Sequence, residues 1–460
     1  MSSRVPYIIV FVTIGILGAF QALPNDLLAI TVFVATFWSF YRGLDTHIPI
    51  LEITACIATL QWLIGPVLGY AFGSSDPRYE MYIEAGRYYA FALPGTCFYL
   101  AALYVFPSET KQREFLATLS DNRLYYRGLA LLGISLVSEL ALRVGVGGLT
   151  FAFVLLSQLR YIAAIYFLYS GHPMRYYLAG LSMVSLLIRS AESAMFHDLI
   201  IWVGLVACFW FHTVRWNPPK KALFFIAGFS FIFTLQVIKA DYRSKVWNHQ
   251  SASLVATVYD KLVRQQAFLD EPTLIAAGQR INQGWIISAI MLHVPLVEPY
   301  AEGETIKDAV ISSIFPRVIY ADKKRAGGQE NFERFTGLNL ESGTSMGTSI
   351  LGEAYANFGK FGGTVFMFLW GLIYAFFYRL AIRHSYKDAY FLFWIPLIFY
   401  QAIKAETELV VVLNQLIKGT VLALIAFFGV HKYIVPDTES PTNDDTDFPE
   451  EDTGSLPEAN

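Results

Sequence analysis

The stretch FAFVLLSQLRYIAAIYFLYS, residues 151–170, holds a single charged side chain, Arg160, within a mostly apolar run. A helix needs about 20 such residues to cross the hydrocarbon core of a bilayer, so the stretch predicts a membrane-spanning helix. The rest of the chain agrees, because 55% of its 460 residues are hydrophobic and only 15% are charged. Lipid cannot form hydrogen bonds with backbone N–H and C=O groups, so each spanning segment should be a helix that satisfies them internally. We therefore predict an all-α, polytopic membrane helix bundle.

About twelve segments are long and apolar enough to be candidate transmembrane helices. They cover residues 6–22, 27–41, 48–72, 88–106, 128–147, 149–169, 177–194, 197–213, 222–239, 361–380, 388–404 and 409–431. Basic residues concentrate in alternate connections between them, at Arg42, Lys111, Arg113, Arg123, Arg127, Arg175, Arg215, Lys220, Lys221, Arg383 and Lys387. Positive loops stay in the cytoplasm, so both termini should be cytoplasmic. We expect the first segment to be a retained helix, not a cleaved signal peptide.

Two regions outside this pattern divide the chain into four parts. Residues 1–239 carry the first nine candidate spans, and residues 361–435 carry the last three. Residues 436–460 are acidic and nearly without large apolar side chains, so they should be a disordered cytoplasmic tail. Residues 240–360 contain no clear span and lie, by parity, on the outer face of the membrane.

The long outer segment carries more apolar pattern than a passive loop. Its run INQGWIISAIMLHVPLVEP, residues 281–299, is too short to span and predicts an interfacial or re-entrant helix. The run TIKDAVISSIFP, residues 305–316, predicts a short amphipathic helix ended by proline. We therefore expect a helical cap that packs back onto the bundle over an active site. A passive extracellular loop is the alternative.

Several charged side chains stand in apolar surroundings. A central arginine costs at least ~2.5 kcal/mol to insert, so Arg160 should face a polar cavity. Arg189 is a second candidate for that cavity, with an ion pair to Glu192 as the alternative. His197 lies at an outer turn and Arg243 at the exit of the ninth span, and we assign both to the same lining.

Two arginines of the outer segment, Arg280 and Arg317, each adjoin one of the short apolar helices. A guanidinium group matches phosphate oxygens in a bidentate way, so these residues predict a site for a lipid-linked phosphate or pyrophosphate. A structural salt bridge is the alternative for each. HExxH, GxSxG, P-loop and Cys/His patterns are missing, and we expect no bound metal or other cofactor. No basic-aromatic module indicates a nucleic-acid partner.

The segments IFPRVIYADKK, residues 314–324, and TSMGTSILGEAYANFGKFGG, residues 344–363, resemble motifs of the Wzy-type oligosaccharide repeat-unit polymerases. That family acts in O-antigen, capsule and exopolysaccharide assembly. Its members show Pro-Arg followed by a hydrophobic residue and a Lys, and then a Gly-Glu-x-Tyr-x-Asn-Phe-Gly segment. The aromatic-Trp pair usual after Pro-Arg is replaced here by Val318, Ile319 and Tyr320.

The resemblance implies a metal-independent glycosyltransferase of the bacterial inner membrane with its active site on the periplasmic side. The donor would be an oligosaccharide on polyprenyl pyrophosphate, such as undecaprenyl pyrophosphate. The acceptor would be a sugar hydroxyl of a second lipid-linked unit. The enzyme would mainly neutralise the leaving group and place the acceptor. Membrane lipid, a chain-length regulator and a flippase of the same pathway are implied partners.

We expect Arg280, Arg317 and Glu353 to be catalytic. The expected substrate-binding residues are Arg160, Arg189, His197, Arg243, Tyr320, Lys323, Tyr355 and Asn357. In a helix, Glu353 and Asn357 share one face and Tyr355 lies away from it, whereas in a strand all three share a face. Glu353 would take a proton from the acceptor or hold an arginine in place. An ordinary helix start is the third interpretation.

Two other functions would use a similar chain. An O-antigen ligase has a similar topology and a different acceptor. A transporter or flippase of lipid-linked sugars would also need many helices and arginines in a cavity. It would not need one large outer segment with short helices of its own, and this asymmetry favours the polymerase.

Overall fold

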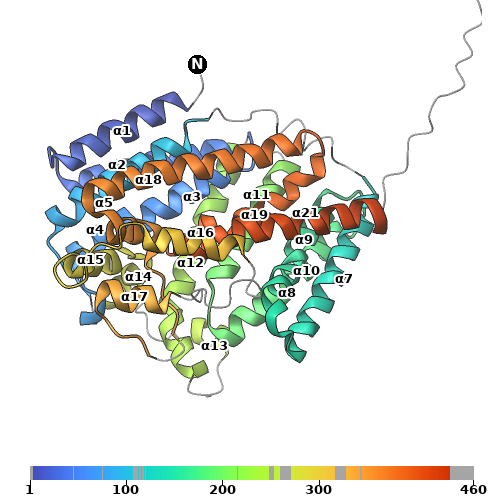
Figure 1. Ribbon diagram of the computed structural model, residues 1–460. Helices are drawn as coiled ribbons and strands as arrows, with labels where there is room; N and C mark the ends of the chain where they lie inside the picture. The colour runs from blue at the N-terminus through green and yellow to red at the C-terminus, as the bar shows by residue number, and fades with distance from the viewer. Residues whose placement is uncertain are drawn as a thin grey trace, which may run out of the picture.

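The computed structural model describes residues 4–435 except 45, 75, 107–111, 113–115, 117–118, 120, 215, 248–252, 260–270, 316–327 and 342–343. Every secondary-structure element within these residues is a helix (Figure 1). Several of the helices are apolar enough to associate with a membrane. The predicted all-α class is therefore confirmed for the described residues, and the apolar helices agree with association with a membrane.

One group of helices combines the two ends of the chain and occupies the upper left of Figure 1. It consists of α1 (Val5–Ala19), α2 (Asn25–Gly43), α3 (Ile50–Thr59), α4 (Gly65–Phe72), α5 (Ala85–Leu103) and α18 (Ser349–Ser385). α5 packs against both α1 and α18, and nearly all of its side chains are buried. The helix that carries the polar motif at residues 351–363 is thus anchored on the N-terminal helices.

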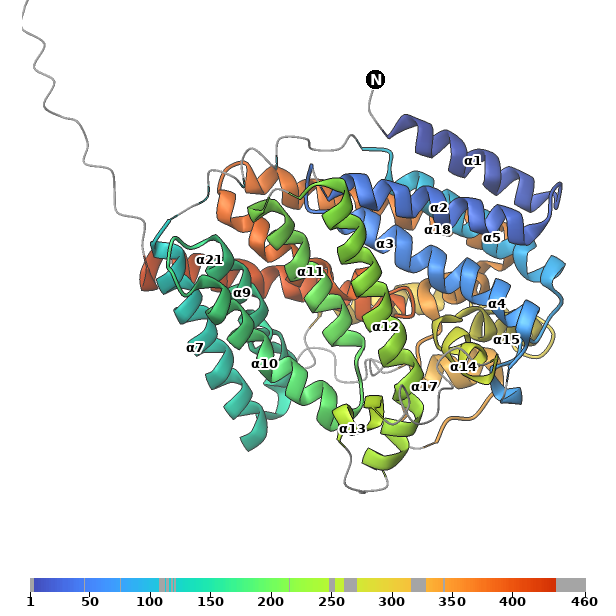
Figure 2. The ribbon, with the colours of Figure 1, turned by 180° about the vertical axis from the view of Figure 1, so that it is seen from behind.

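A second group lies at the opposite end of the molecule, as both views show (Figures 1 and 2). It consists of α7 (Arg123–Val144), α8 (Thr150–Ser157), α9 (Leu159–Tyr169), α10 (Arg175–Ser193), α11 (His197–Thr213) and α21 (Thr420–Phe428). α9 is at its centre, buried along its whole length and packed against α7, α10 and α11. The stretch at residues 151–170 therefore supplies the core of this group.

The remaining helices connect the two groups. They are α12 (Pro218–Trp247), α13 (Leu254–Tyr259), α14 (Glu271–Ile281), α15 (Gly284–His293), α16 (Glu304–Ile314), α17 (Gln329–Thr336), α19 (Ile395–Ile403) and α20 (Leu409–Asn414). Figure 2 shows α12 running beside α11 from the end of α2 towards α13. α14 packs on α4, α15 on α18, and α16 on α20, so these helices of the predicted outer segment fold back onto the bundle.

Each predicted span overlaps a helix or a run of helices, but the expected count of twelve is not confirmed. Among the described residues, five helices are long and apolar enough to cross a bilayer. They are Ile50–Phe72, Gly147–Tyr169, Pro218–Ile238, Ser349–Ser385 and Leu409–Ile434. α1 and α11 are apolar but shorter. α10 is long enough, but charged and hydroxyl residues such as Arg189 and Ser190 interrupt it.

α15 is the helix of the run at residues 281–299, for which we expect an interfacial or re-entrant helix. All of its residues from Gly284 to Met291 are buried, and it packs between α4, α17 and α18. Residues 284–291 are therefore covered by protein, whereas Leu292, Leu296 and Val297 at the end of the apolar run are exposed. α16, in contrast, confirms the predicted amphipathic helix at residues 305–316, because it alternates buried and exposed positions.

A π-helical turn, η1 (Leu60–Ile64), joins α3 and α4 into one long helix. Such a turn widens the helix and leaves carbonyl groups to partners outside it. The carbonyl oxygens of Trp62 and Leu63 accept hydrogen bonds from the hydroxyls of Tyr88 and Tyr89, at 2.8 and 2.9 Å. The turn thereby attaches α5 to the middle of the α3–α4 helix.

The same turn receives the chain between α14 and α15. The backbone N–H of Gln283 donates to the carbonyl of Gln61 at 3.1 Å. Gly65, one residue after the turn, lies so close to Asn282 that an added Cβ would come within 2.6 Å of the Asn282 Cα. Glycine is required there for close approach of the two backbones.

Candidate active site

The polar motif forms a short helical piece of its own at the start of α18. The helix changes direction at Gly359, whose φ of 66° and ψ of −162° are not helical and favour glycine. An added Cβ there would lie 2.9 Å from the Tyr300 hydroxyl oxygen. Residues 349–358 therefore stand apart from the long apolar part of α18, as expected for the first turns of a helix.

The two faces of this piece differ as the helical prediction requires. Glu353 and Asn357 face α16 and the start of α20. Tyr355 points elsewhere, edge-on to Phe91 with a ring distance of 5.1 Å, and lies 6.3 Å from the ring of Tyr300. The prediction that Glu353 and Asn357 share a face is confirmed, and Tyr355 lies outside their hydrogen-bond cluster.

Glu353 is 2% exposed, and its Oε2 accepts a hydrogen bond from the backbone N–H of Leu409 at 2.9 Å. Leu409 is the first residue of α20. N–H groups at a helix start have no partner inside the helix and lie at the positive end of its dipole. A carboxylate from another helix satisfies one of them here, so Glu353 fixes the start of α20 against α18.

Asn357 uses both ends of its amide. Its Nδ2 donates to Thr305 Oγ1 and to the Glu353 carbonyl oxygen, each at 2.8 Å. Its Oδ1 accepts from the backbone N–H of Gly303 at 3.0 Å. The side chain is 1% exposed. Asn357 therefore fixes the start of α16, just as Glu353 fixes the start of α20.

The turn between α19 and α20, residues 404–408 with the sequence KAETE, is the centre of a polar cluster. Lys404 Nζ lies 2.9 Å from Asp198 Oδ1, and His197 Nδ1 lies 2.7 Å from Glu406 Oε1. Burial would raise the pKa of Glu406, but the hydrogen bond and charge of His197, with help from Lys404, hold it below its usual value. His197 thus belongs to this cluster, on the side of α11.

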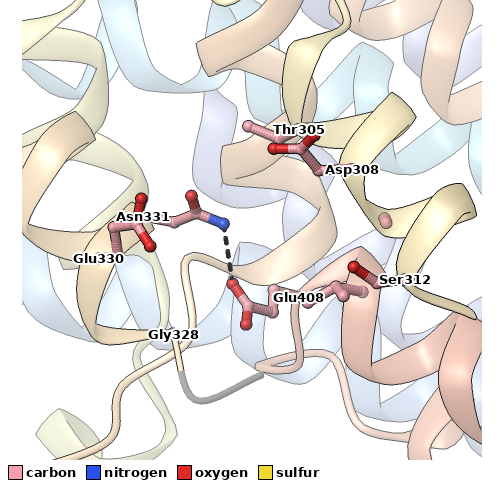
Figure 3. Close-up of a pocket in the computed structure, with 9 residues that line it drawn as sticks. Thr305, Asp308, Ser312, Gly328, Glu330, Asn331 and Glu408 are labelled. Carbon is pink, nitrogen blue, oxygen red and sulfur yellow. Dashed lines mark hydrogen bonds between the residues drawn. The ribbon is translucent and has the colours of Figure 1, made fainter. Parts of the chain in front are cut away.

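A small cavity lies between this turn, α16 and α17 (Figure 3). Its polar lining consists of Thr305, Asp308 and Ser312 from α16, Glu330 and Asn331 from α17, and Glu408 from the turn. Figure 3 shows Glu408 pointing towards Asn331, whose Nδ2 donates to Glu408 Oε2 at 3.2 Å. The cavity measures about 20 Å³ and presents three carboxyl groups.

The motif at residues 351–363 forms the wall behind this cavity. Thr305, the hydrogen-bond partner of Asn357, lines the cavity. Leu409, the partner of Glu353, directly follows Glu408, which also lines it. The two predicted polar residues therefore position the lining through their neighbours.

Arg160 is buried in an ion pair within the second helix group. It is 2% exposed and its guanidinium meets the carboxylate of Glu139 on α7. It also donates to Ser135 Oγ at 2.9 Å and to the carbonyl of Ser157 at 2.7 Å. The acid that balances Arg160 lies in another helix, so it cannot be found by looking for an acid within residues 151–170. These partners account for its burial without a ligand.

Arg189 bonds the same carboxylate. Its guanidinium lies 3.0 Å from Glu139 Oε1, so its ion pair is with α7 and not with the predicted Glu192. This pair is half exposed on the Arg189 side. The structure therefore brings Arg160 and Arg189 together, but away from the helices that line the cavity at Glu408.

Arg280 and Arg243 lie along α12. The guanidinium of Arg280 on α14 donates to the carbonyl oxygen of Gln236, and Arg243 follows two helical turns later on α12. One hypothesis is that Glu353 holds an arginine in place. The described contacts of Arg280 do not include Glu353, so the described residues give no support to this role toward Arg280. Arg317, Tyr320 and Lys323 lie outside the described residues.

Sequence analysis missed the acidic residues that line the cavity: Asp308, Glu330 and Glu408. A signal for Glu408 was present. Lys404, Glu406 and Glu408 place charges at alternate positions between two long apolar runs, where each charge needs a partner. Asp308 and Glu330 carried no such signal, because they stand in polar stretches where acids are common.

Comparison of the chain with protein-family models, curated proteins and solved structures finds no match.

Proposed function

We propose that this chain joins polyprenyl-pyrophosphate-linked oligosaccharide repeat units into a surface polysaccharide at the outer side of a bacterial inner membrane. A hydroxyl oxygen of the acceptor unit attacks the anomeric carbon of the donor. The bond from that carbon to the pyrophosphate oxygen breaks, polyprenyl pyrophosphate leaves, and the hydroxyl proton passes to a base.

The observation that carries the proposal is that residues bonded to one motif segment, or flanking the other, line one cavity. The segment at residues 344–363 supplies Asn357, which bonds the cavity residue Thr305. The other motif, with Arg317, lies in the chain between Ser312 and Gly328, and both of these residues line the same cavity. One motif therefore bonds a residue of the cavity, and described residues on either side of the other motif line it.

The chemistry of the lining suits a sugar acceptor. Carboxyl groups such as Glu408 and Asp308 accept hydrogen bonds from sugar hydroxyls, and one of them can take the proton. We assign Glu353 the role of orienting the turn that carries Glu408. Arg280 and Arg317 are assigned to the charge that develops on the departing pyrophosphate. At about 20 Å³ the cavity admits little more than a water, so the α16–α17 wall must open for a sugar.

The test is the length distribution of surface polysaccharide in cells that depend on this chain. Glu408→Gln keeps the size of the side chain and removes its negative charge, so we expect a collapse to single repeat units at normal membrane level of the protein. Glu302→Gln is the matched control, because Glu302 is an exposed acid beside the site that does not line the cavity. It should leave the polymer ladder unchanged.

The other outcomes separate the alternative functions. An unchanged ladder with Glu408→Gln contradicts the proposal for this cavity. Loss of all attached repeats, with polymer still made on its lipid carrier, identifies a ligase. Loss of lipid-linked units from the outer leaflet identifies a flippase. An Arg317→Ala variant in the same assay tests the arginine assignment separately.

A further inference from the structure

A second cavity, remote from the acidic one, lies between α2, α11 and α12 and has a volume of about 220 Å³. Its lining is almost wholly apolar and aromatic, with Phe40 of α2, Phe211 of α11, and Phe225 and Phe229 of α12 among its residues. Phe225 packs edge-on to Phe40 at a ring distance of 5.7 Å. We call this cavity the apolar groove.

Two glycines keep the groove open. Gly204 on α11 and Gly228 on α12 both line it, and a Cβ added at either would meet no atom within 4 Å. α12 is also loosely held, because only 22% of its apolar membrane window is buried inside the protein. The groove is therefore a space between membrane helices that the protein's own side chains leave open.

One face of α12 leads from the groove to the two arginines. Phe225 and Ile232 line the groove and are two turns apart, and Gln236 follows one turn later on the same face. Arg280 donates to the Gln236 carbonyl, and Arg243 lies two further turns along that face. The apolar groove and two guanidinium groups, the side chains that best match a phosphate, thus lie along the same helix, with the groove ending at Ile232.

The length of this path selects the occupant. At 1.5 Å per residue, the path from Phe225 to Arg243 is about 27 Å long. One leaflet contributes only half of a hydrocarbon core of about 30 Å, so an ordinary acyl chain attached at Arg243 would not reach the far end of the groove. An isoprenoid chain much longer than a leaflet is deep would do so.

We infer that the apolar groove holds the isoprenoid chain of the polyprenyl pyrophosphate, with its pyrophosphate at Arg280 and Arg243. This inference rests on the proposed function, which supplies the lipid class. It adds where on this chain the lipid tail lies, and it makes tail length a determinant of binding.

The test measures binding and not polymerisation. Purified protein is titrated with undecaprenyl pyrophosphate, with the short-chain farnesyl pyrophosphate, and with phosphatidylglycerol. Gly204→Leu and Gly228→Leu fill the groove, and we expect each to weaken binding of the long-chain probe about tenfold by displacing buried apolar surface. Binding of farnesyl pyrophosphate should change little, since its chain is too short to reach these residues.

Two further variants complete the design. Gly180→Leu on α10 is the matched control, because an added Cβ there also meets no atom within 4 Å and the residue lies away from the groove. Leucine is a better helix former than glycine, so all three variants should fold, and thermal melting checks this. Arg280→Ala should weaken both pyrophosphate probes, since it removes a contact to the head.

Two results would overturn the inference. Unchanged long-chain affinity in both filled variants, with normal melting, would exclude the groove as the tail site. An equal loss of phosphatidylglycerol and undecaprenyl pyrophosphate would identify ordinary membrane lipid as the occupant. A different result would contradict the proposed function itself, namely wild-type protein that binds neither pyrophosphate probe.

Discussion

The carboxylate of Glu353 on α18 caps the backbone N–H of Leu409, 56 residues further along the chain, at 2.9 Å. This contact joins the polar motif to the turn at residues 404–408. That turn carries Glu408 into the cavity and Glu406 to His197. This buried hydrogen bond links the acidic turn directly to α18, while the ion pairs of Lys404 and Glu406 hold the turn on the side of α11.

Replacing Glu353 separates an orienting role from a catalytic one. In Glu353→Gln the amide oxygen still accepts the Leu409 N–H, so we expect nearly normal protein level and polymer length. In Glu353→Ala the buried N–H loses its partner, at a cost of about 1–3 kcal/mol, and both protein level and polymer should fall. The measurement is a polysaccharide ladder with an immunoblot. A Gln variant with normal level and no polymer would instead make Glu353 the base.

Asn357→Asp should destabilise the fold more than most substitutions of one atom. Aspartate keeps an acceptor for the Gly303 N–H but loses the donor to Thr305 and to the Glu353 carbonyl. It also buries a negative charge beside that carbonyl oxygen. We expect a loss of at least about 2 kcal/mol, read as a lower midpoint of thermal unfolding in detergent. An unchanged midpoint would show that the clamp on α16 contributes little.

The Arg160–Glu139 ion pair predicts a large single-variant effect and a small double-variant effect. Glu139→Gln leaves the buried guanidinium uncompensated and should cost about 3 kcal/mol. Replacing both residues with apolar ones of similar size, as in Arg160→Met with Glu139→Leu, should restore most of the stability. Arg189→Ala is the control, with less than about 1 kcal/mol expected because that side chain is half exposed. Additive losses would contradict a direct pair.

The His197–Glu406 pair predicts a loss of stability in acid. The pKa of Glu406 is lower in the folded protein than its ordinary value of 4.5. A depressed pKa contributes stability that is fully present above the unfolded value and is lost as the pH falls through the folded one. The thermal midpoint should therefore hold this contribution from pH 7 to about 5 and lose it below about 4.5. Glu406→Gln should make the thermal midpoint less dependent on pH in this range. If the variant shows the same pH dependence as the wild type, Glu406 is not the group responsible.

The helices themselves were predictable because an apolar segment in lipid must satisfy its own backbone hydrogen bonds. An α-helix does so with bonds between residues that are close in the sequence. The position of α15 was not predictable, because an apolar run of its length suits a membrane surface and a protein interior equally. Its place was decided by contacts with α4 and α18, which lie far away in the sequence. The expected number of spanning helices is not confirmed for a related reason, since helices covered by protein need not be uniformly apolar.

In the site, the shared face of Glu353 and Asn357 followed from their spacing of four residues. Their partners did not follow, because Leu409 and Thr305 come from other helices. The same holds for Arg160, whose acid Glu139 lies on α7. The spacing of residues in a helix predicts which side chains share a face. Their contact partners on other helices are known only from the packed structure.

The π-helical turn at Leu60–Ile64 makes the length of its helix unusually sensitive to single-residue change. It acts as one inserted residue, so deleting any residue within it would restore a regular α-helix. At 3.6 residues per turn, α3 would then rotate by about 100° relative to α4. Thr54, which bonds Tyr374 of α18 at 3.0 Å, and Gly65, which admits Asn282, could no longer be satisfied together. The π-helical turn therefore fixes the rotation of α3 relative to α4. Substitutions within the turn preserve this rotation, whereas deletion of a residue does not.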